Sequence, residues 1–65
     1  MTEDLDAANH YLVRAEECRA IAHGMTDSRT RQSLMNVAHD YVQMSETRRN
    51  MHAISEMLKR GRAET

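Results

Sequence analysis

The sequence predicts an all-α fold, a single antiparallel hairpin of two helices spanning about residues 3–23 and 27–60. Three observations support this prediction. The 65 residues contain no proline and are rich in good helix formers. Apolar residues recur every three or four positions in two long stretches, which is the period of an α-helix. The only clear break between the stretches is the short segment around Gly24. A chain of this length holds one domain, which we assign to residues 1–65.

The first predicted helix carries its apolar residues on two adjoining lines. They are Leu5, Ala8, Leu12 and Ala15, followed by Tyr11, Cys18, Ala22 and Met25. Thr2 is expected to cap its start, where three acids also suit the positive end of the helix dipole. Gly24 is expected to end the helix, because glycine adopts the left-handed conformation common at this position.

The second predicted helix begins with a cap at Thr26 or Asp27, and Asp27 is four residues from Arg31, as in a helical ion pair. Its apolar positions are Leu34, Val37, Ala38, Tyr41, Met44, Met51, Ile54 and Leu58. The helix is expected to end near Lys59 and Arg60, with Gly61 just beyond and residues 61–65 as a frayed tail.

A short connection makes the two helices antiparallel neighbours. With the turn centred near Thr26, residues whose numbers add up to about 52 should lie at the same height. Tyr11 then meets Tyr41, and Ala15 meets Val37. By the same rule Cys18 faces Leu34 and Ala8 faces Met44. We therefore expect small residues of the first helix to pack against large residues of the second.

The second helix should extend past the start of the first by about 11 residues, or roughly 16 Å. Apolar side chains on and beside this overhang have no cover within the hairpin. They are Met44, Met51, Ile54, Met57 and Leu58. We expect them to form the interface of a two-fold homodimer, a four-helix bundle. Two alternatives stay open: the last turns fray in solution, or the stripe binds an unidentified different protein.

Polar side chains are also expected near the seam between the helices. Because buried charge is costly unless it is paired, the sequence predicts a partly buried cluster that joins Arg14 or Glu17 to the second helix. The cluster consists of Arg14, Glu17, Arg31, Tyr11 and Tyr41. We expect it to fix the helix register and the choice of partner rather than to catalyse a reaction.

Residues able to carry chemistry are present, but their spacing does not suit a site. None of the four histidines lies three or four residues from another, as helical metal sites require. A metal bridged across the helices by His10 and His39 is an alternative. Cys18 shares its helix face with no histidine and is expected to act as a small hydrophobe. We therefore predict no catalytic residue, no metal, no cofactor and no enzymatic activity.

Net charge is −1, but acids dominate residues 1–27 and bases dominate residues 28–65. This division favours an acidic helix lying against a basic one. Nucleic-acid binding through the basic second half of the second helix, including Arg48 and Arg49, is the alternative. Glu46 and Glu56 interrupt that basic surface, and no aromatic residue accompanies it, so nucleic acid is not the favoured partner.

No apolar run is long enough to suggest membrane insertion or a secretion signal, and a single cysteine cannot form an internal disulfide. We therefore expect no membrane association and a location in the reducing cytoplasm.

Two segments, "YLVRAEECRAIA" at residues 11–22 and "DSRTRQSLMNVAHDYVQMSE" at 27–46, resemble a group of small uncharacterised bacterial helical-hairpin proteins. The shared pattern is Tyr-x-x-Arg-Ala-x-Glu-Cys-Arg-x-x-Ala, a short turn, then Asp-x-x-x-Arg-x-x-Leu-x-x-x-Ala-x-x-Tyr. Its positions here are Tyr11, Arg14, Ala15, Glu17, Cys18, Arg19, Ala22, Asp27, Arg31, Leu34, Ala38 and Tyr41. The resemblance covers about half of the chain and implies the hairpin fold without any assigned activity. Taken together, the sequence predicts a non-catalytic protein–protein interaction or regulatory module that self-associates.

Overall fold

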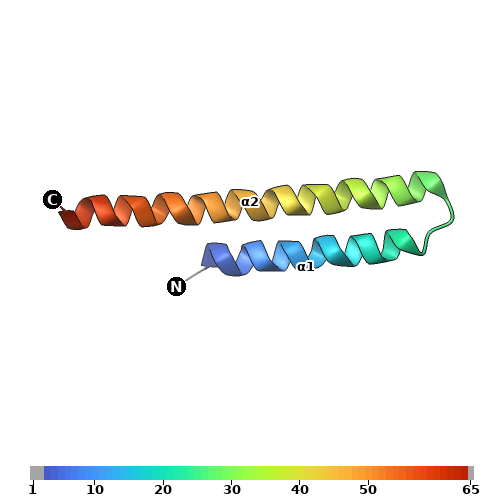
Figure 1. Ribbon diagram of the computed structural model, residues 1–65, viewed down its shortest axis with the longest axis horizontal. Helices are drawn as coiled ribbons and strands as arrows, with labels where there is room; N and C mark the ends of the chain where they lie inside the picture. Colours follow the sequence, from blue (N-terminus) through green and yellow to red (C-terminus); the bar gives the residue numbers. More distant parts are fainter. Residues whose placement is uncertain (1–2, 65) are drawn as a thin grey trace.

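The computed structural model describes residues 3–64, with the side chains of residues 3–61. It consists of two helices, α1 at Glu3–His23 and α2 at Ser28–Glu64. They run antiparallel and side by side, and α2 continues well past the N-terminal end of α1 (Figure 1). The predicted all-α hairpin is confirmed. The predicted cap at Thr2 lies outside the described residues.

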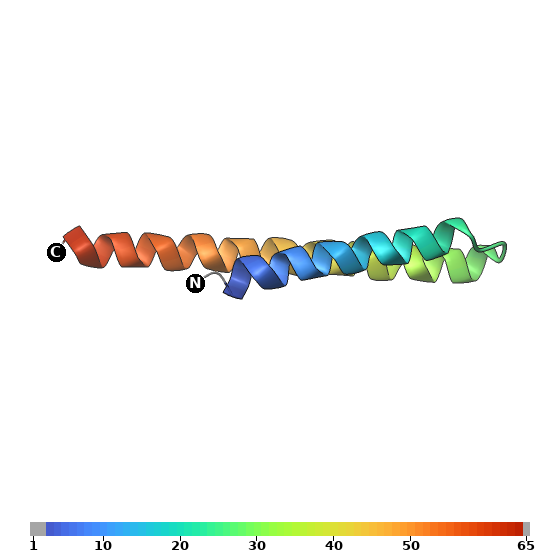
Figure 2. The same cartoon turned by 90° about the horizontal axis from the view of Figure 1, so that it is seen from below.

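The molecule is a thin rod of 59 × 17 × 10 Å. Figure 2 shows it turned by 90°, with the two helices crossing at a shallow angle. Its radius of gyration is 16.3 Å, whereas a compact domain of this length would have about 11 Å. Two helices in one layer can cover only one side of each other, so most of both helical surfaces is exposed.

Small residues form the seam between the helices. Ala8, Ala15 and Ala22 follow one another at intervals of seven on α1 and are 0–1% exposed. Ala38 and Ser45, also seven apart on α2, are each 1% exposed. A seven-residue repeat keeps one line of a helix facing its partner, and small side chains on that line let the two backbones approach closely.

The expected packing of small residues of α1 against Val37 and Met44 is therefore wrong. Val37 and Met44 are 42% and 43% exposed, and their neighbours Ala38 and Ser45 are buried in their place. Consecutive residues of a helix point about 100° apart. Close approach of the helices favours the line of small residues at the centre of the seam and leaves the larger side chains at its edge.

The predicted register is confirmed at two levels of the hairpin. The rings of Tyr11 and Tyr41 stack with their centroids 6.1 Å apart. Nearer the open end, the guanidinium of Arg48 donates a 2.8 Å hydrogen bond to the carboxylate of Asp4. Both pairs have residue numbers that add up to 52, as expected for a turn centred near Thr26.

The connection differs from the predicted left-handed glycine cap, because no described glycine has a positive φ. Two tight backbone bonds close α1 instead: the amides of Gly24 and Met25 donate to the carbonyls of Ile21 and Ala22, both at 3.1 Å. Such bonds between residues three apart satisfy carbonyls at the helix end without a left-handed residue.

Asp27 is the residue that caps α2. Its carboxylate accepts a 2.9 Å bond from the amide of Thr30 and a 2.6 Å bond from the Thr30 hydroxyl. These two bonds lower the pKa of Asp27, because they stabilise its charged form. Of the two predicted caps, Thr26 and Asp27, the structure selects Asp27.

The far end of α2 extends four residues beyond its predicted end near Arg60. Gly61 continues the helix, and nothing lies within 4 Å of the position its Cβ would occupy. Because Asp4 is level with Arg48, α2 outruns α1 from about residue 50. We call residues 50–64 the overhang; they span roughly 22 Å. The sequence predicts that residues 61–65 fray. Residue 65 and the side chains of residues 62–64 lie outside the described part of the chain, so this fraying stays a prediction.

Candidate interaction surface

One contact between the helices is aromatic. Tyr11 and Tyr41 stack at an angle of 25° between their rings, and His10 meets the edge of Tyr11 with centroids 6.5 Å apart. Both tyrosines are half-buried. This stack occupies one flank of the small-residue seam, and it brings together two of the five residues predicted for the polar cluster.

Charged and polar contacts tie α2 to α1 near the start of α1. The Arg48–Asp4 ion pair is partly buried, with 41% and 28% of the two side chains exposed. The hydrogen bond that Arg48 donates to the Asp4 carboxylate raises the pKa of the guanidinium, because it stabilises the charged form. On the other flank, Arg49 donates a 3.4 Å hydrogen bond to the side-chain oxygen of Asn9.

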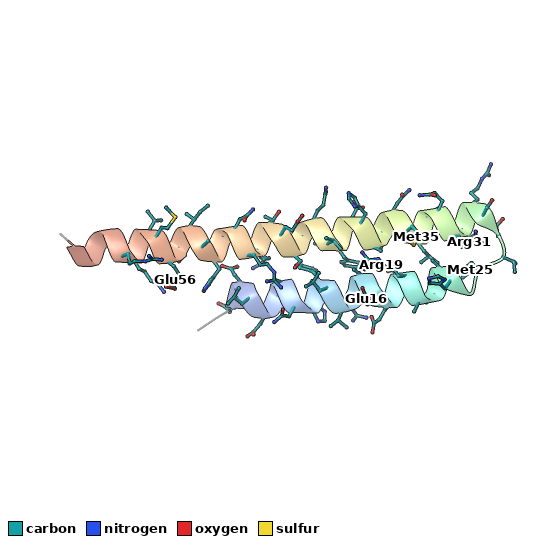
Figure 3. The ribbon with its side chains drawn as sticks, in the orientation of Figure 1. Glu16, Arg19, Met25, Arg31, Met35 and Glu56 are labelled. Carbon is teal, nitrogen blue, oxygen red and sulfur yellow. The ribbon has the colours of Figure 1, made fainter. Side chains whose placement is uncertain are left out.

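The other members of the predicted polar cluster lie apart, which corrects that prediction. Arg14 and Glu17 pair with each other along α1 at 3.1 Å, and both side chains are more than half exposed. Arg31 donates a 2.8 Å bond to the carbonyl of Met25, so its guanidinium closes the turn (Figure 3). Since the seam is filled by alanines, longer polar side chains find partners on their own helix or at the turn.

Apolar side chains lie exposed along one flank of α2 and over the overhang. Met51, Ile54, Met57 and Leu58 are 52–65% exposed, and Met44 is 43% exposed. These are the five residues that the sequence predicts for an interface. Four of them lie on the overhang, which α1 does not reach (Figure 1), and Met44 lies on a flank of the paired segment.

An open groove of about 480 Å³ lies along this flank of α2 and reaches Tyr11 in the middle of α1. Its lining consists of Tyr11, Asp40, Gln43, Met44, Thr47 and Arg48. A second groove, of about 370 Å³, lies near the turn and includes Arg19, Arg31 and Met35 (Figure 3). The first groove joins a stacked tyrosine to an exposed methionine, and four polar side chains complete its lining.

Groups that could bind a metal are scattered. Within residues 3–61, no three side chains of His, Cys, Asp or Glu lie together in a way that could hold an ion. Cys18, the one free thiol, is half-buried, as is Leu34, its predicted counterpart across the seam. No helix over the described residues is both long enough and apolar enough to cross a membrane.

Several contact residues were not predicted from the sequence, although two of its features indicate them. Applying the register of 52 to charged residues pairs Asp4 with Arg48, and scanning for intervals of seven finds both small-residue lines. The buried position of Ser45 is harder to anticipate. Its hydroxyl has no hydrogen-bond partner among the described residues, so only the geometry of the seam places it there.

Comparison of the chain with protein-family models, with curated proteins and with solved structures finds no match in any of the three. The resemblance to small bacterial helical-hairpin proteins therefore stays a prediction.

Proposed function

We propose that the chain is a non-catalytic protein–protein interaction module that self-associates, with two copies forming a homodimer of four helices. The observation that carries this proposal is the set of exposed apolar side chains at Met44, Met51, Ile54, Met57 and Leu58. An apolar surface along a helix that has no partner is typical of an interface.

Two further features support an interaction role over catalysis. The larger groove combines Tyr11 and Met44 with Asp40, Thr47 and Arg48, and this lining contains no cysteine, serine or histidine that could form a nucleophile–base pair. Methionine side chains adapt their shape to a partner, and the interface contains three of them. The proposed location is the reducing cytoplasm, in which the single free thiol of the chain, Cys18, would stay reduced.

The charges of α2 give less support to nucleic-acid binding. Arg48 and Arg49, at the centre of the basic segment, are engaged by Asp4 and Asn9 of α1, and Lys59 lies 3.7 Å from Glu56. Cations that already have anionic or polar partners neutralise fewer phosphates. We therefore advance no second function.

Sedimentation of the tag-free chain at several concentrations tests the proposal. The wild type should sediment as a dimer, and Ile54→Glu should sediment as a monomer of lower thermal stability, because a carboxylate would be buried in an apolar interface. His39→Glu is the matched control: residue 39 is exposed on the opposite side of α2 from Met44, so this variant should remain a dimer. A wild type that stays monomeric, or an Ile54→Glu variant of unchanged mass, contradicts the proposal.

A further inference from the structure

A second line of residues at intervals of seven runs along α2 beside the one that faces α1. It consists of Val37, Met44, Met51 and Leu58, which are 42%, 43%, 52% and 63% exposed. Each follows the last by two helical turns, so together they form one continuous stripe, the geometry of a coiled-coil seam. We call this line the lateral stripe. Because Ala38 and Ser45 already fill the seam with α1, α2 has one occupied seam and one free seam.

The opposite flank of α2 is polar. Residues that follow the occupied seam by one position, and so lie on its other side, are Gln32, His39, Glu46, Ala53 and Arg60, all exposed. The occupied seam also becomes polar where it passes onto the overhang, at His52, Glu56 and Lys59. A partner helix that extended the line of α1 along the overhang would contact these polar groups. A partner helix on the lateral stripe would contact apolar side chains instead.

The area exposed by the chain is large enough for a stable dimer. The chain exposes 5238 Å², whereas a compact monomer of 7.5 kDa exposes about 4,200 Å². The excess of roughly 1,000 Å² exceeds the contribution of about 800 Å² that each partner makes to an interface of standard size.

Building on the proposed self-association, we infer that the partner is a second copy whose α2 lies antiparallel on the lateral stripe, with the two-fold axis between Thr47 and Arg48. The stripe is complementary to itself in this register, in which facing residues have numbers that add up to 95. Val37 then faces the partner's Leu58, and Met44 faces the partner's Met51. Every apolar residue of the stripe is matched by another, as a two-fold interface requires.

This register also places the overhang on the partner's hairpin. Lys59 comes level with the partner's Asn36, which the hairpin register sets beside the partner's Glu16. α1 contains five acids against two arginines, whereas Lys59 and Arg60 give the described end of the overhang a positive excess. Lys59 lies 3.7 Å from Glu56 and Glu16 lies 2.6 Å from Arg19 within one chain, so the attraction comes from the net charges: α1 is negative overall, and Glu56, Lys59 and Arg60 together are positive. This long-range complementarity favours the pairing over a random one.

Disulfide trapping tests the register in a Cys18→Ala background, so that each chain has one introduced thiol. Met44→Cys and Met51→Cys chains are unfolded together, refolded as a mixture and oxidised mildly. The mixture should give a cross-linked dimer of one chain of each kind. Either variant alone should stay largely uncross-linked, because two copies of residue 44 would lie roughly 10 Å apart along the helices. Met44→Cys mixed with Ala53→Cys is the control and should not cross-link.

The possible outcomes separate this inference from the proposed function. A dimer by sedimentation in which Met44→Cys cross-links with itself indicates parallel helices, and overturns the register while leaving self-association intact. Self-linking of Leu58→Cys, with no link between residues 44 and 51, indicates pairing of the overhangs alone and overturns it equally. A monomeric chain with no cross-link in any mixture overturns both.

Discussion

The paired segment of α2 and its overhang belong to one helix but are stabilised in different ways. Between residues 28 and 49, α2 lies against α1 and buries Ala38 and Ser45. Beyond residue 50 no described side chain is buried, and Ile54, Met57 and Leu58 are more than half exposed. The buried side chains of α2 are thus small and lie in the paired segment, whereas the large apolar side chains of the overhang are exposed.

This difference shows that hydrophobicity and burial are decoupled in the isolated hairpin. Alanine and serine fill the seam because their size permits close contact, although they bury little apolar area. Methionine, isoleucine and leucine could bury much more, but they lie on an exposed flank and on the overhang. The paired segment therefore sets the geometry of the hairpin, and in the proposed dimer the exposed apolar residues would supply the free energy of association.

The largest effect is expected from breaking the paired segment at its centre. Ala15→Leu puts a branched side chain where the native one is 0% exposed, which should force the helices apart and cost about 1–3 kcal/mol or more. Small domains have little stability in reserve, so the melting curve followed by circular dichroism should shift sharply downwards. Ala20→Leu, at an exposed position of α1, should leave it nearly unchanged. Equal curves for the two variants would show that the seam is not closely packed.

A smaller effect of opposite sign is expected at Ser45. Its buried hydroxyl has no hydrogen-bond partner among the described residues, and such a group costs about 1–3 kcal/mol in desolvation. Ser45→Ala removes that cost, keeps the small volume and should raise the melting temperature by several degrees. Ser33→Ala, at an exposed position of α2, is the control. A lower melting temperature for Ser45→Ala would mean that the hydroxyl makes a useful contact.

The smallest effect concerns the turn, at the end of the paired segment farthest from the overhang. The bonds from Thr30 lower the folded-state pKa of Asp27, so the stabilisation they give is complete above its ordinary pKa and is lost as the pH falls through the lowered value. Asp27→Asn keeps a capping oxygen without titrating. Melting temperatures at pH 7 and pH 3 should differ slightly less for Asp27→Asn than for the wild type. An identical difference would show that this cap does not contribute to acid sensitivity.

Much of the hairpin could be predicted from local patterns. The period of the apolar residues locates both helices, and the short connection fixes their register well enough to pair Tyr11 with Tyr41. The capping preference of aspartate identifies the start of α2. Predictions that needed relative side-chain size were less successful. Val37 was expected in the seam and lies at its edge, because Ala38, one position along, permits closer approach.

Candidate site residues show the same division. The exposed apolar residues were predictable, since a helix longer than its neighbour must leave side chains uncovered. The polar contacts could not be predicted in this way. Arg14 and Glu17 pair with each other along α1, and Arg48, a candidate for phosphate binding, pairs with Asp4. Long polar side chains reach several partners, and only the spacing of the helices decides among them.

Helix propensity, capping and chain length act locally, so the amino-acid pattern alone predicts that the chain is helical, where it turns and that one helix is longer than the other. Tertiary structure decided which face of each helix is closed. Two backbones can approach closely only along lines of small residues, and that choice assigned Ala38 and Ser45 to the seam and left Val37, Met44, Met51 and Leu58 exposed beside it.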